Sequence, residues 1–341
     1  MKGLEIAKLY FEQFGLPMLK EQFPEVLPYL AAGLTGSGSE CFGFDDEISR
    51  DHDFEPGFCI FLPGEDIVDR RTAFQLERAY AKLPKEFMGL QRAMLQPVGG
   101  PRHGVFRTAE YFRDKIGVPA TDMRTEEVSP AGPDAAAAEG SSASDALANA
   151  LTASFWMQLP EYALAETVNG EIFLDNYGEI TEIRETLHTW PEDVRLKKLA
   201  GHLLLMGQSG QYNYRRCVRH GENAAAQLAV CEFVKSTMEV IFLLNRQYQP
   251  YYKWSFRALR ALPLLSIEAE LLEFLLTTDN EAALAEEKYD VIEGIASDII
   301  DELMEQGLTK ANCGDLEKHA YSVNDGIGDP SLRNLHVLAG V

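Results

Sequence analysis

Two carboxylates separated by one residue, Asp51 and Asp53, follow a turn rich in glycine and serine that contains Gly38 and Ser39. If this stretch is extended, both carboxylates point to the same side of the chain, where they repel each other unless a cation lies between them. Mg²⁺ prefers such oxygen ligands and is often bound together with substrate phosphates. The backbone of a glycine turn and a serine hydroxyl can bind those phosphates. The stretch therefore predicts one site for a metal ion, with Asp51 and Asp53 as ligands, and for a triphosphate.

The charged residues around this pair also allow a plainer interpretation. Asp45, Asp46 and Glu47 precede the pair, and a solvated acidic loop would have the same composition. Arg50, directly before the pair, is a candidate ligand for a phosphate, or it forms an ion pair with Asp46 or Glu47. His52 should point away from the two carboxylates, which favours a packed or hydrogen-bonded histidine over a metal ligand.

A polar stretch, SGQYNYRR at 209–216, interrupts a helical pattern later in the chain. Gln211, Tyr212 and Asn213 can both donate and accept hydrogen bonds, so they are candidates for binding a base or an acceptor, with Arg216 as a candidate for binding a phosphate. A turn between two helices, capped by Asn213, is the alternative interpretation.

The composition limits the classes of protein to which the chain can belong. It has 341 residues, of which 46% are hydrophobic, and this is enough for two domains with packed cores. The net charge of −22 argues against nucleic acid and anionic membranes as partners and is compatible with a cationic small molecule. The sequence has no segment of membrane-spanning length, and its five scattered cysteines form no Cys-x-x-Cys pair. We therefore expect a cytoplasmic protein with reduced thiols and no structural zinc site.

The hydrophobic pattern predicts two kinds of architecture along the chain. Helix and strand patterns alternate over residues 1–190, whereas residues 191–341 have an almost entirely helical pattern. We expect an α+β domain over 1–190, followed by an all-α helical bundle over 191–341. Residues 119–148, rich in Ala, Gly, Ser, Pro and acids, are expected to be a flexible insertion. Residues 322–341 are expected to be a loosely held tail.

Individual elements are predicted from the same pattern. Strands are expected at 52–62 and 103–108, and the second of these leads into a helix at 109–116. Residues 171–174 and 180–183 flank a turn that begins at Asp175, which predicts a β-hairpin. Further helices are predicted at 2–31 (as two short helices), 66–83, 152–167, 191–209, 222–246, 251–262, 266–276, 280–307 and 310–320.

The order and spacing of Gly38-Ser39 and Asp51-His52-Asp53 resemble the DNA polymerase β-like nucleotidyltransferase superfamily. Four stretches together resemble the DUF4037 family of bacterial nucleotidyltransferase-like proteins. These are GSGSECFGFDDEISRDHDF at 36–54, PEDVRLKKLA at 191–200, GQYNYRR at 210–216 and FLLNRQYQPYYKW at 242–254. The resemblance extends over most of residues 30–265.

The resemblance implies a small mixed sheet flanked by helices, the nucleotidyltransferase core, and a helical domain that closes over the nucleotide. Gly38 and Ser39 would bind phosphates of ATP or another NTP, and Asp51 and Asp53 would hold Mg²⁺ or Mn²⁺. The resemblance also implies that Lys253 neutralises the triphosphate, and a helix-packing seam with Lys253 in solvent is the alternative. The implied reaction transfers a nucleoside monophosphate to a hydroxyl-bearing acceptor and releases pyrophosphate.

Active members of this superfamily usually carry a third carboxylate, which helps to bind the metal or acts as a base. Asp175 is the candidate for this catalytic residue, and Glu171 and Glu110 are alternatives. A chain that lacks such a group would bind nucleotide without catalysis, so a catalytically inactive regulatory protein is one alternative function. A nucleotidyltransferase that modifies a protein or an RNA is another.

Overall fold

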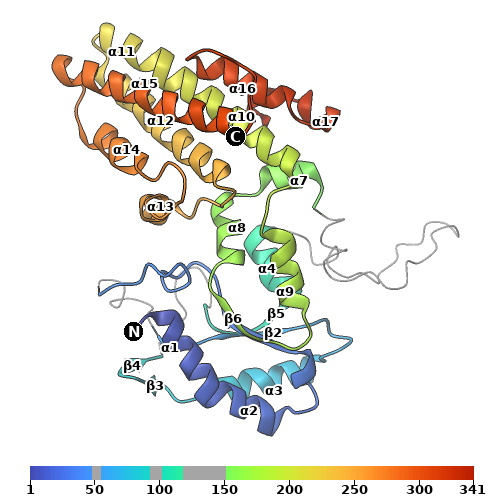
Figure 1. The fold of residues 1–341 in the computed structure, drawn as a ribbon. Helices are drawn as coiled ribbons and strands as arrows, with labels where there is room; N and C mark the ends of the chain where they lie inside the picture. The colour runs from blue at the N-terminus through green and yellow to red at the C-terminus, as the bar shows by residue number, and fades with distance from the viewer. Residues whose placement is uncertain (48–54, 93–101, 118–150) are drawn as a thin grey trace, which may run out of the picture. The chain divides into compact units, whose positions relative to one another are not determined.

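The computed structural model describes residues 1–47, 55–92, 102–117 and 151–341 (Figure 1). The chain divides into two compact units. Unit 1 consists of residues 1–152 and 163–188, and unit 2 consists of residues 153–162 and 189–341. Five of the features singled out in the sequence lie outside the described residues, namely Arg50, Asp51, His52, Asp53 and the insertion at 119–148.

A four-stranded sheet in the order β5-β2-β1-β6 forms the centre of unit 1 (Figure 1). Its strands are β1 (Ala31–Leu34), β2 (Cys59–Leu62), β5 (Gly104–Arg107) and β6 (Glu171–Asp175). Strand β1 is antiparallel to both of its neighbours, whereas β5 is parallel to β2. β1 and β2 are buried along their whole length, which explains their uninterrupted apolar sequences. The predicted combination of helices with a small mixed sheet is confirmed.

Helices cover both faces of this sheet (Figure 1). On one face, rings of the first helices and of α3 pack around Phe58, whose ring centroid lies 5.2 Å from that of Phe11 and 5.1 Å from that of Tyr80. On the other face, Tyr111 of α4 packs edge-on against Phe61 at 5.1 Å. The elements of unit 1 outside the sheet are α1 (Gly3–Tyr10), a π-helical turn (Phe11–Gly15), α2 (Leu16–Gln22), a 3-10 turn (Leu27–Tyr29), α3 (Arg70–Ala81), β3 (Glu86–Phe87), β4 (Leu90–Gln91), α4 (Thr108–Ile116) and α9 (Glu179–Leu187). Helix α8 (Glu161–Val168) begins in unit 2 and ends in unit 1.

The described residues of unit 2 form helices and connecting turns, as the sequence predicts for this region. The elements are α7 (Ala153–Gln158), α10 (Glu192–Met206), a π-helix (Gly207–Tyr214), α11 (Arg215–Arg219), α12 (Asn223–Leu244), α13 (Tyr252–Leu259), α14 (Glu268–Thr277), α15 (Ala282–Glu305), α16 (Leu316–Asp325), α17 (Pro330–Arg333) and a 3-10 turn (Val337–Gly340). Helix α10 is the central element and packs against α12, α16 and the 3-10 turn. None of the helices within the described ranges combines the length and the apolar composition that a membrane span requires.

The predicted β-hairpin at 171–183 is wrong, because residues 180–183 belong to helix α9. Strand β6 pairs with β1 instead, with Asp175 opposite Ala31. The carboxylate of Asp175 accepts hydrogen bonds from the backbone N–H groups of Gly178 and Thr181, both at 2.8 Å. These bonds satisfy N–H groups at the start of α9, so the predicted hairpin turn is the entry to a helix.

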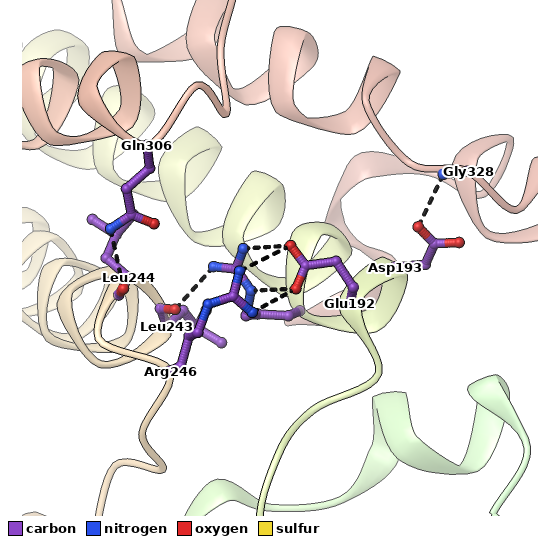
Figure 2. A network of polar contacts seen from close by, with 8 residues as sticks. Glu192, Asp193, Leu243, Leu244, Arg246, Gln306 and Gly328 are labelled. Carbon is purple, nitrogen blue, oxygen red and sulfur yellow. Dashed lines mark hydrogen bonds and ion pairs between the residues drawn. The ribbon is translucent and has the colours of Figure 1, made fainter.

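The expectation of a loosely held tail at 322–341 is also wrong. These residues include the end of α16, α17 and the last 3-10 turn, which pack on α10. The buried ammonium of Lys197 donates hydrogen bonds to Asn324 Oδ1 at 2.8 Å and to the carbonyl of Leu335 at 2.7 Å. Asp193, also on α10, accepts from the backbone N–H of Gly328 at 2.9 Å (Figure 2). The C-terminal segment is therefore held by polar groups that its own sequence does not reveal.

An ion-pair network joins the start of α10 to the end of α12 (Figure 2). Arg195, with a side chain that is 1% exposed, donates two hydrogen bonds to the carboxylate of Glu192 and one to the carbonyl of Leu243 at 3.0 Å. Arg246 donates to the same carboxylate at 2.8 Å. Hydrogen bonds from Arg195 and then Arg246 lower the pKa of Glu192 to about 2. The buried guanidinium of Arg195 thus depends on Glu192 for its counter-charge.

Gly170, at the start of β6, provides a test of the fold of unit 1. Its φ is +67°, and an added Cβ would overlap the carbonyl oxygen of Leu34. We expect Gly170→Ala to lower the free energy of unfolding by about 3 kcal/mol, from left-handed backbone strain and from the displacement of β1. Gly178→Ala is the matched control, because its φ of +81° is similar but nothing lies within 4 Å of the added Cβ. Urea unfolding should show a loss of about 1 kcal/mol for the control, and equal losses would contradict the steric contribution.

The Glu192 network predicts a specific dependence of stability on pH. Because the pKa of Glu192 is lowered on folding, its contribution is present above the ordinary pKa of 4.5 and is lost as the pH falls towards 2. The stability difference between the wild type and Glu192→Gln should therefore be largest above pH 4.5 and should disappear near pH 2 in acid unfolding curves. Glu273→Gln, which removes the exposed pair with Arg260, is the control and should change little at any pH. A constant difference for Glu192→Gln would contradict the assignment.

Candidate functional site

The turn after β1, residues 35–41, is tied to the connection between α8 and β6. The side chain of Asn169 accepts a hydrogen bond from the N–H of Gly36 at 2.9 Å and donates one to its carbonyl at 2.7 Å. The N–H of Gly170 donates to the carbonyl of Cys41 at 2.9 Å. Gly36 has a φ of 130°, a conformation that favours glycine. Both ends of the turn are thus fixed by contacts to one segment.

A cavity of about 440 Å³ lies beside this turn, within unit 1. Its wall consists of the turn itself, of residues from β5 and of side chains from α3 and α4. The charged residues on the wall are Glu40, Glu77, Arg102, Arg107, Glu110, Asp114 and Lys115. A cavity that carries charges of both signs suits a ligand that has anionic groups together with a cation.

Two cations on this wall have hydrogen-bonding capacity for an anion. Arg107 donates from Nη1 to the carbonyl of Pro63 at 2.7 Å, whereas its buried Nη2 has no hydrogen-bond partner in the described part of the chain. Lys115 forms an ion pair with Glu166 at 2.7 Å, and its Nζ lies 3.7 Å from the position that a Cβ would take at Gly36. Because an ammonium has three N–H donors, Lys115 can hold Glu166 and a further acceptor at the turn.

The two cations lie at opposite ends of α4. Arg107 directly precedes the helix and Lys115 is in its last turn, which separates them by about 12 Å along the helix axis. The cavity therefore offers positive charge at two places, beside the turn and at the end of β5. The distance between these two charges suits an elongated polyanion that contacts both.

Gly38 lies on the wall of this cavity, and Ser39 is the next residue in the turn. An added Cβ at Gly38 would collide with the carboxylate of Glu40, which is 7% exposed and lies against the glycine. The carbonyl of Ser39 accepts hydrogen bonds from the N–H groups of Phe42 and Phe44 at 3.2 and 2.9 Å, which closes the turn. A side chain at position 38 would therefore have to displace the carboxylate of Glu40.

Two buried thiols and a phenol adjoin the turn. Burial raises the pKa of Cys59 to about 12 and raises that of Cys41 well above its ordinary value. Burial also raises the pKa of Tyr111, which donates a hydrogen bond to the carbonyl of Thr35 at 3.1 Å. These groups stay protonated at neutral pH, so neither thiol is a nucleophile here.

The three candidates for a third carboxylate lie in different surroundings. Asp175 is at the end of β6 that pairs with Ala31, and its carboxylate is occupied by the start of α9. Glu171 is at the other end, opposite Leu34, and forms an ion pair with Lys8.

Glu110, on α4, is the only one of these three candidates that lines the cavity. It shares the wall with Gly38 and Lys115, so the structure brings it together with a predicted phosphate-binding residue.

The described residues do not supply a metal site by themselves. In residues 1–47, 55–92, 102–117 and 151–341, no group of three or more His, Cys, Asp or Glu side chains is arranged to hold a metal ion. The predicted ligands Asp51 and Asp53, and the neighbouring Arg50, lie outside these ranges.

The remaining predicted site residues belong to unit 2. Gln211, Tyr212 and Asn213 lie together on the π-helix, on the wall of a cavity of about 560 Å³. The amide of Gln211 donates to Glu293 and to the carbonyl of Gly314, and its oxygen accepts from the backbone of α16. These bonds give Gln211 a structural role, joining the π-helix to α15 and α16.

Lys253 does not line the cavity that contains Gln211. It lies on α13, and its ammonium is 4.9 Å from the ring centroid of its neighbour Trp254. Tyr212 is 59% exposed and accepts a hydrogen bond from Arg216 at 3.0 Å.

The sequence analysis missed Arg107, Lys115 and Asn169. Arg107 ends a predicted strand and Lys115 lies on the predicted helix that follows, so two cations along one strand-helix unit were a readable signal. Asn169 has no such signal, because it is 133 residues away from the glycine that it holds.

Comparison with known proteins gives one match. Residues 156–255 match a family described as a domain of unknown function (DUF4037). No curated protein and no solved structure matches the chain. The matched range contains the stretches at 191–200, 210–216 and 242–254 but not the turn and acidic pair at 36–54. The resemblance to the DUF4037 family is therefore supported over residues 156–255.

Proposed function

We propose that unit 1 binds a nucleoside triphosphate at the turn after β1 and transfers its nucleoside monophosphate to a hydroxyl-bearing acceptor. The observation that carries this proposal is a single cavity whose wall includes Gly38 of the Gly-Ser turn and the cations Lys115 and Arg107. The chain has a net charge of −22, so a triphosphate can bind only where cations are placed to meet its charge. The unpartnered Nη2 of Arg107 supports the presence of an anionic ligand.

The proposed roles follow from these positions. The acceptor oxygen attacks the α-phosphorus, the bond to the oxygen that bridges to the β-phosphate breaks, and pyrophosphate leaves. Lys115 and Arg107 stabilise the charge that develops on the pyrophosphate. Glu110 is the carboxylate on the cavity wall that we assign to accept the proton of the acceptor hydroxyl.

Mg²⁺ or Mn²⁺ would polarise the phosphate under attack. Asp51 and Asp53 are the residues proposed to hold it, because their spacing after the Gly-Ser turn suits a pair of carboxylate ligands. Glu40, Glu77 and Asp114 add carboxylate oxygens to the wall, and these are ligands of the kind that Mg²⁺ prefers.

A second candidate function is nucleotide binding without catalysis. The observation that favours it is the carboxylate of Asp175, which is occupied by hydrogen bonds from Gly178 and Thr181 rather than available at the cavity. If Glu110 does not replace it as the base, the chain would bind a triphosphate and release no pyrophosphate.

Lys115→Met tests whether the cavity binds a triphosphate. Removing this ammonium should weaken the binding of ATP with Mg²⁺ about tenfold, because a charge-assisted hydrogen bond to phosphate is lost. Lys82→Met, at the exposed end of α3, is the matched control and should bind like the wild type. Isothermal titration calorimetry measures both affinities. Arg107→Gln is a second test that leaves the pair between Lys115 and Glu166 intact, and unchanged affinity in both cavity variants would refute the site.

Replacing both predicted metal ligands, Asp51→Asn/Asp53→Asn, tests catalysis separately from binding. We expect the wild type to release pyrophosphate from an NTP with a suitable acceptor, and the double variant to lose both this release and the dependence of NTP binding on Mg²⁺. A coupled pyrophosphate assay and calorimetry at varied Mg²⁺ provide the two readouts. Binding without pyrophosphate release across an acceptor screen would favour the non-catalytic alternative, and no binding of any NTP would exclude both.

A further inference from the structure

Unit 2 contains a second cavity, of about 660 Å³, lined by the segment before α8, by α10 and α12, and by the segment before α13. All of its lining residues fall within 153–162 and 189–341, so its properties do not depend on unit 1. Its size is that of a pocket for a small organic molecule.

Three acidic or amide oxygens in this cavity are short of hydrogen-bond donors. Glu161 is 7% exposed; its Oε2 accepts from the N–H of Gln249 at 3.4 Å, and its Oε1 is 3.9 Å from Lys198 Nζ. Among the described residues, no other group donates a hydrogen bond to Glu161 Oε1, Glu239 Oε2 or Gln249 Oε1, and all three atoms are buried. The two carboxyl groups have only each other as hydrogen-bond partners for these oxygens. Buried acceptors without donors are costly, so a ligand that brings several N–H donors would relieve this cost.

The charges around these oxygens determine what the ligand can be. Lys198 is 6% exposed, and its Nζ lies 5.0 Å from the centroid of the Trp190 ring. The positive charge of Lys235 favours the ionised form of Glu239. Burial, followed by the charge of Glu161, raises the pKa of Glu239 well above its ordinary value, so this carboxyl group holds a proton at neutral pH and can share it with Glu161 in a hydrogen bond.

His202, on the same wall, is neutral at this pH. Burial and then the charge of Lys198 lower the pKa of His202 to about 3. Lys198 is the cation among the lining residues, so the local charges balance while Glu239 holds its proton. If the proton leaves, two carboxylates face one cation, and this charge favours a second cation over an anion.

We propose that this cavity binds the ammonium group of an organic amine, with Glu161, Glu239 and Gln249 as its hydrogen-bond acceptors. A tetrahedral ammonium carries three N–H donors, one for each of these buried oxygens once the proton between Glu161 and Glu239 is displaced. A bare metal ion fits less well, because no three His, Cys, Asp or Glu side chains of the described residues are arranged for one.

The rim of the cavity favours an organic amine with an apolar or aromatic body. Tyr162, Tyr251 and Tyr252 line it and are 44%, 43% and 73% exposed. Their rings can pack against the body of a ligand and attract its positive charge. The three acceptors all lie within the residues that match the DUF4037 family. Two of the quoted stretches, at 191–200 and 242–254, contribute Lys198 and Gln249, so the cavity gives these stretches a shared role.

The first test compares benzylamine, which is protonated at neutral pH, with benzyl alcohol, which has a similar shape and no charge. Calorimetric titration into the full-length chain should show saturable binding of benzylamine, at least about tenfold tighter than that of benzyl alcohol. Equal affinities, no saturable binding of benzylamine, or saturation by CaCl₂ in place of benzylamine would each overturn the proposal.

Variants locate the binding in this cavity. Glu161→Gln should weaken benzylamine binding about tenfold and remove the preference over benzyl alcohol. Glu286→Gln, an exposed acid on α15 outside the cavity, is the matched control and should leave binding unchanged. If Glu161→Gln binds benzylamine like the wild type, the proposal is wrong.

Proton release gives a readout that does not depend on the stability of Glu161→Gln. An ammonium that takes the place of the shared proton should release about one proton, seen as a dependence of the binding enthalpy on the ionisation enthalpy of the buffer. Glu239→Gln should abolish this release. Release that persists undiminished in Glu239→Gln would overturn the assignment of that carboxyl group.

Discussion

The two hydrogen bonds between Asn169 and the backbone of Gly36 are the constraint on which unit 1 depends. Strand β6 comes late in the sequence of unit 1 but lies beside β1, so the turn after β1 reaches its shape only when the chain returns to it. Thr35 adds to this contact, because its hydroxyl lies 3.0 Å from Asn169 Oδ1 and 2.9 Å from the carbonyl of Glu166. The geometry of the Gly-Ser turn is therefore a tertiary property, fixed across 133 residues, and not a property of its local sequence.

This constraint explains which parts of the fold the sequence predicts. The strand at 104–107 and the helix after it are predicted well, because periodicity and strand length are local signals. Residues 180–183 were wrongly assigned to a strand, because two isoleucines three residues apart fit a short apolar strand as well as one face of a helix. What decides between them is the pairing of β6 with β1, which is not local. The prediction of a loosely held tail at 322–341 is wrong for the same reason, because Lys197, which donates to the carbonyl of Leu335, lies on α10.

The candidate site shows a similar division. Turn chemistry directs attention to Gly38, which lies on the cavity wall and packs against the carboxylate of Glu40. The sequence places Arg107 and Lys115 along one predicted strand-helix unit, but only the cavity shows that both lie on one wall. Polar character alone does not identify a site residue either. The amide of Gln211 is occupied by tertiary partners that its own stretch of sequence does not contain. A polar residue is a site candidate only after its structural partners are known.

Buried charges elsewhere in unit 2 show why the unpartnered oxygens matter. The ammonium of Lys288 donates to Gln227, Asn280 and the carbonyl of Thr278, all within 3.1 Å, and that of Lys197 is held by Asn324 and Leu335. Within the described residues of the same unit, Glu161 Oε1 and Glu239 Oε2, on the wall of a cavity, have no donor other than the proton that the two carboxyl groups share. Among the described residues that line the cavity of unit 1, the side chain with an unpartnered buried atom is Arg107, whose Nη2 is a donor. Because a folded chain normally pairs its buried polar groups, the two cavities differ in the charge of the ligand each would accept: an anion at the Gly-Ser turn and a cation between α8 and α12.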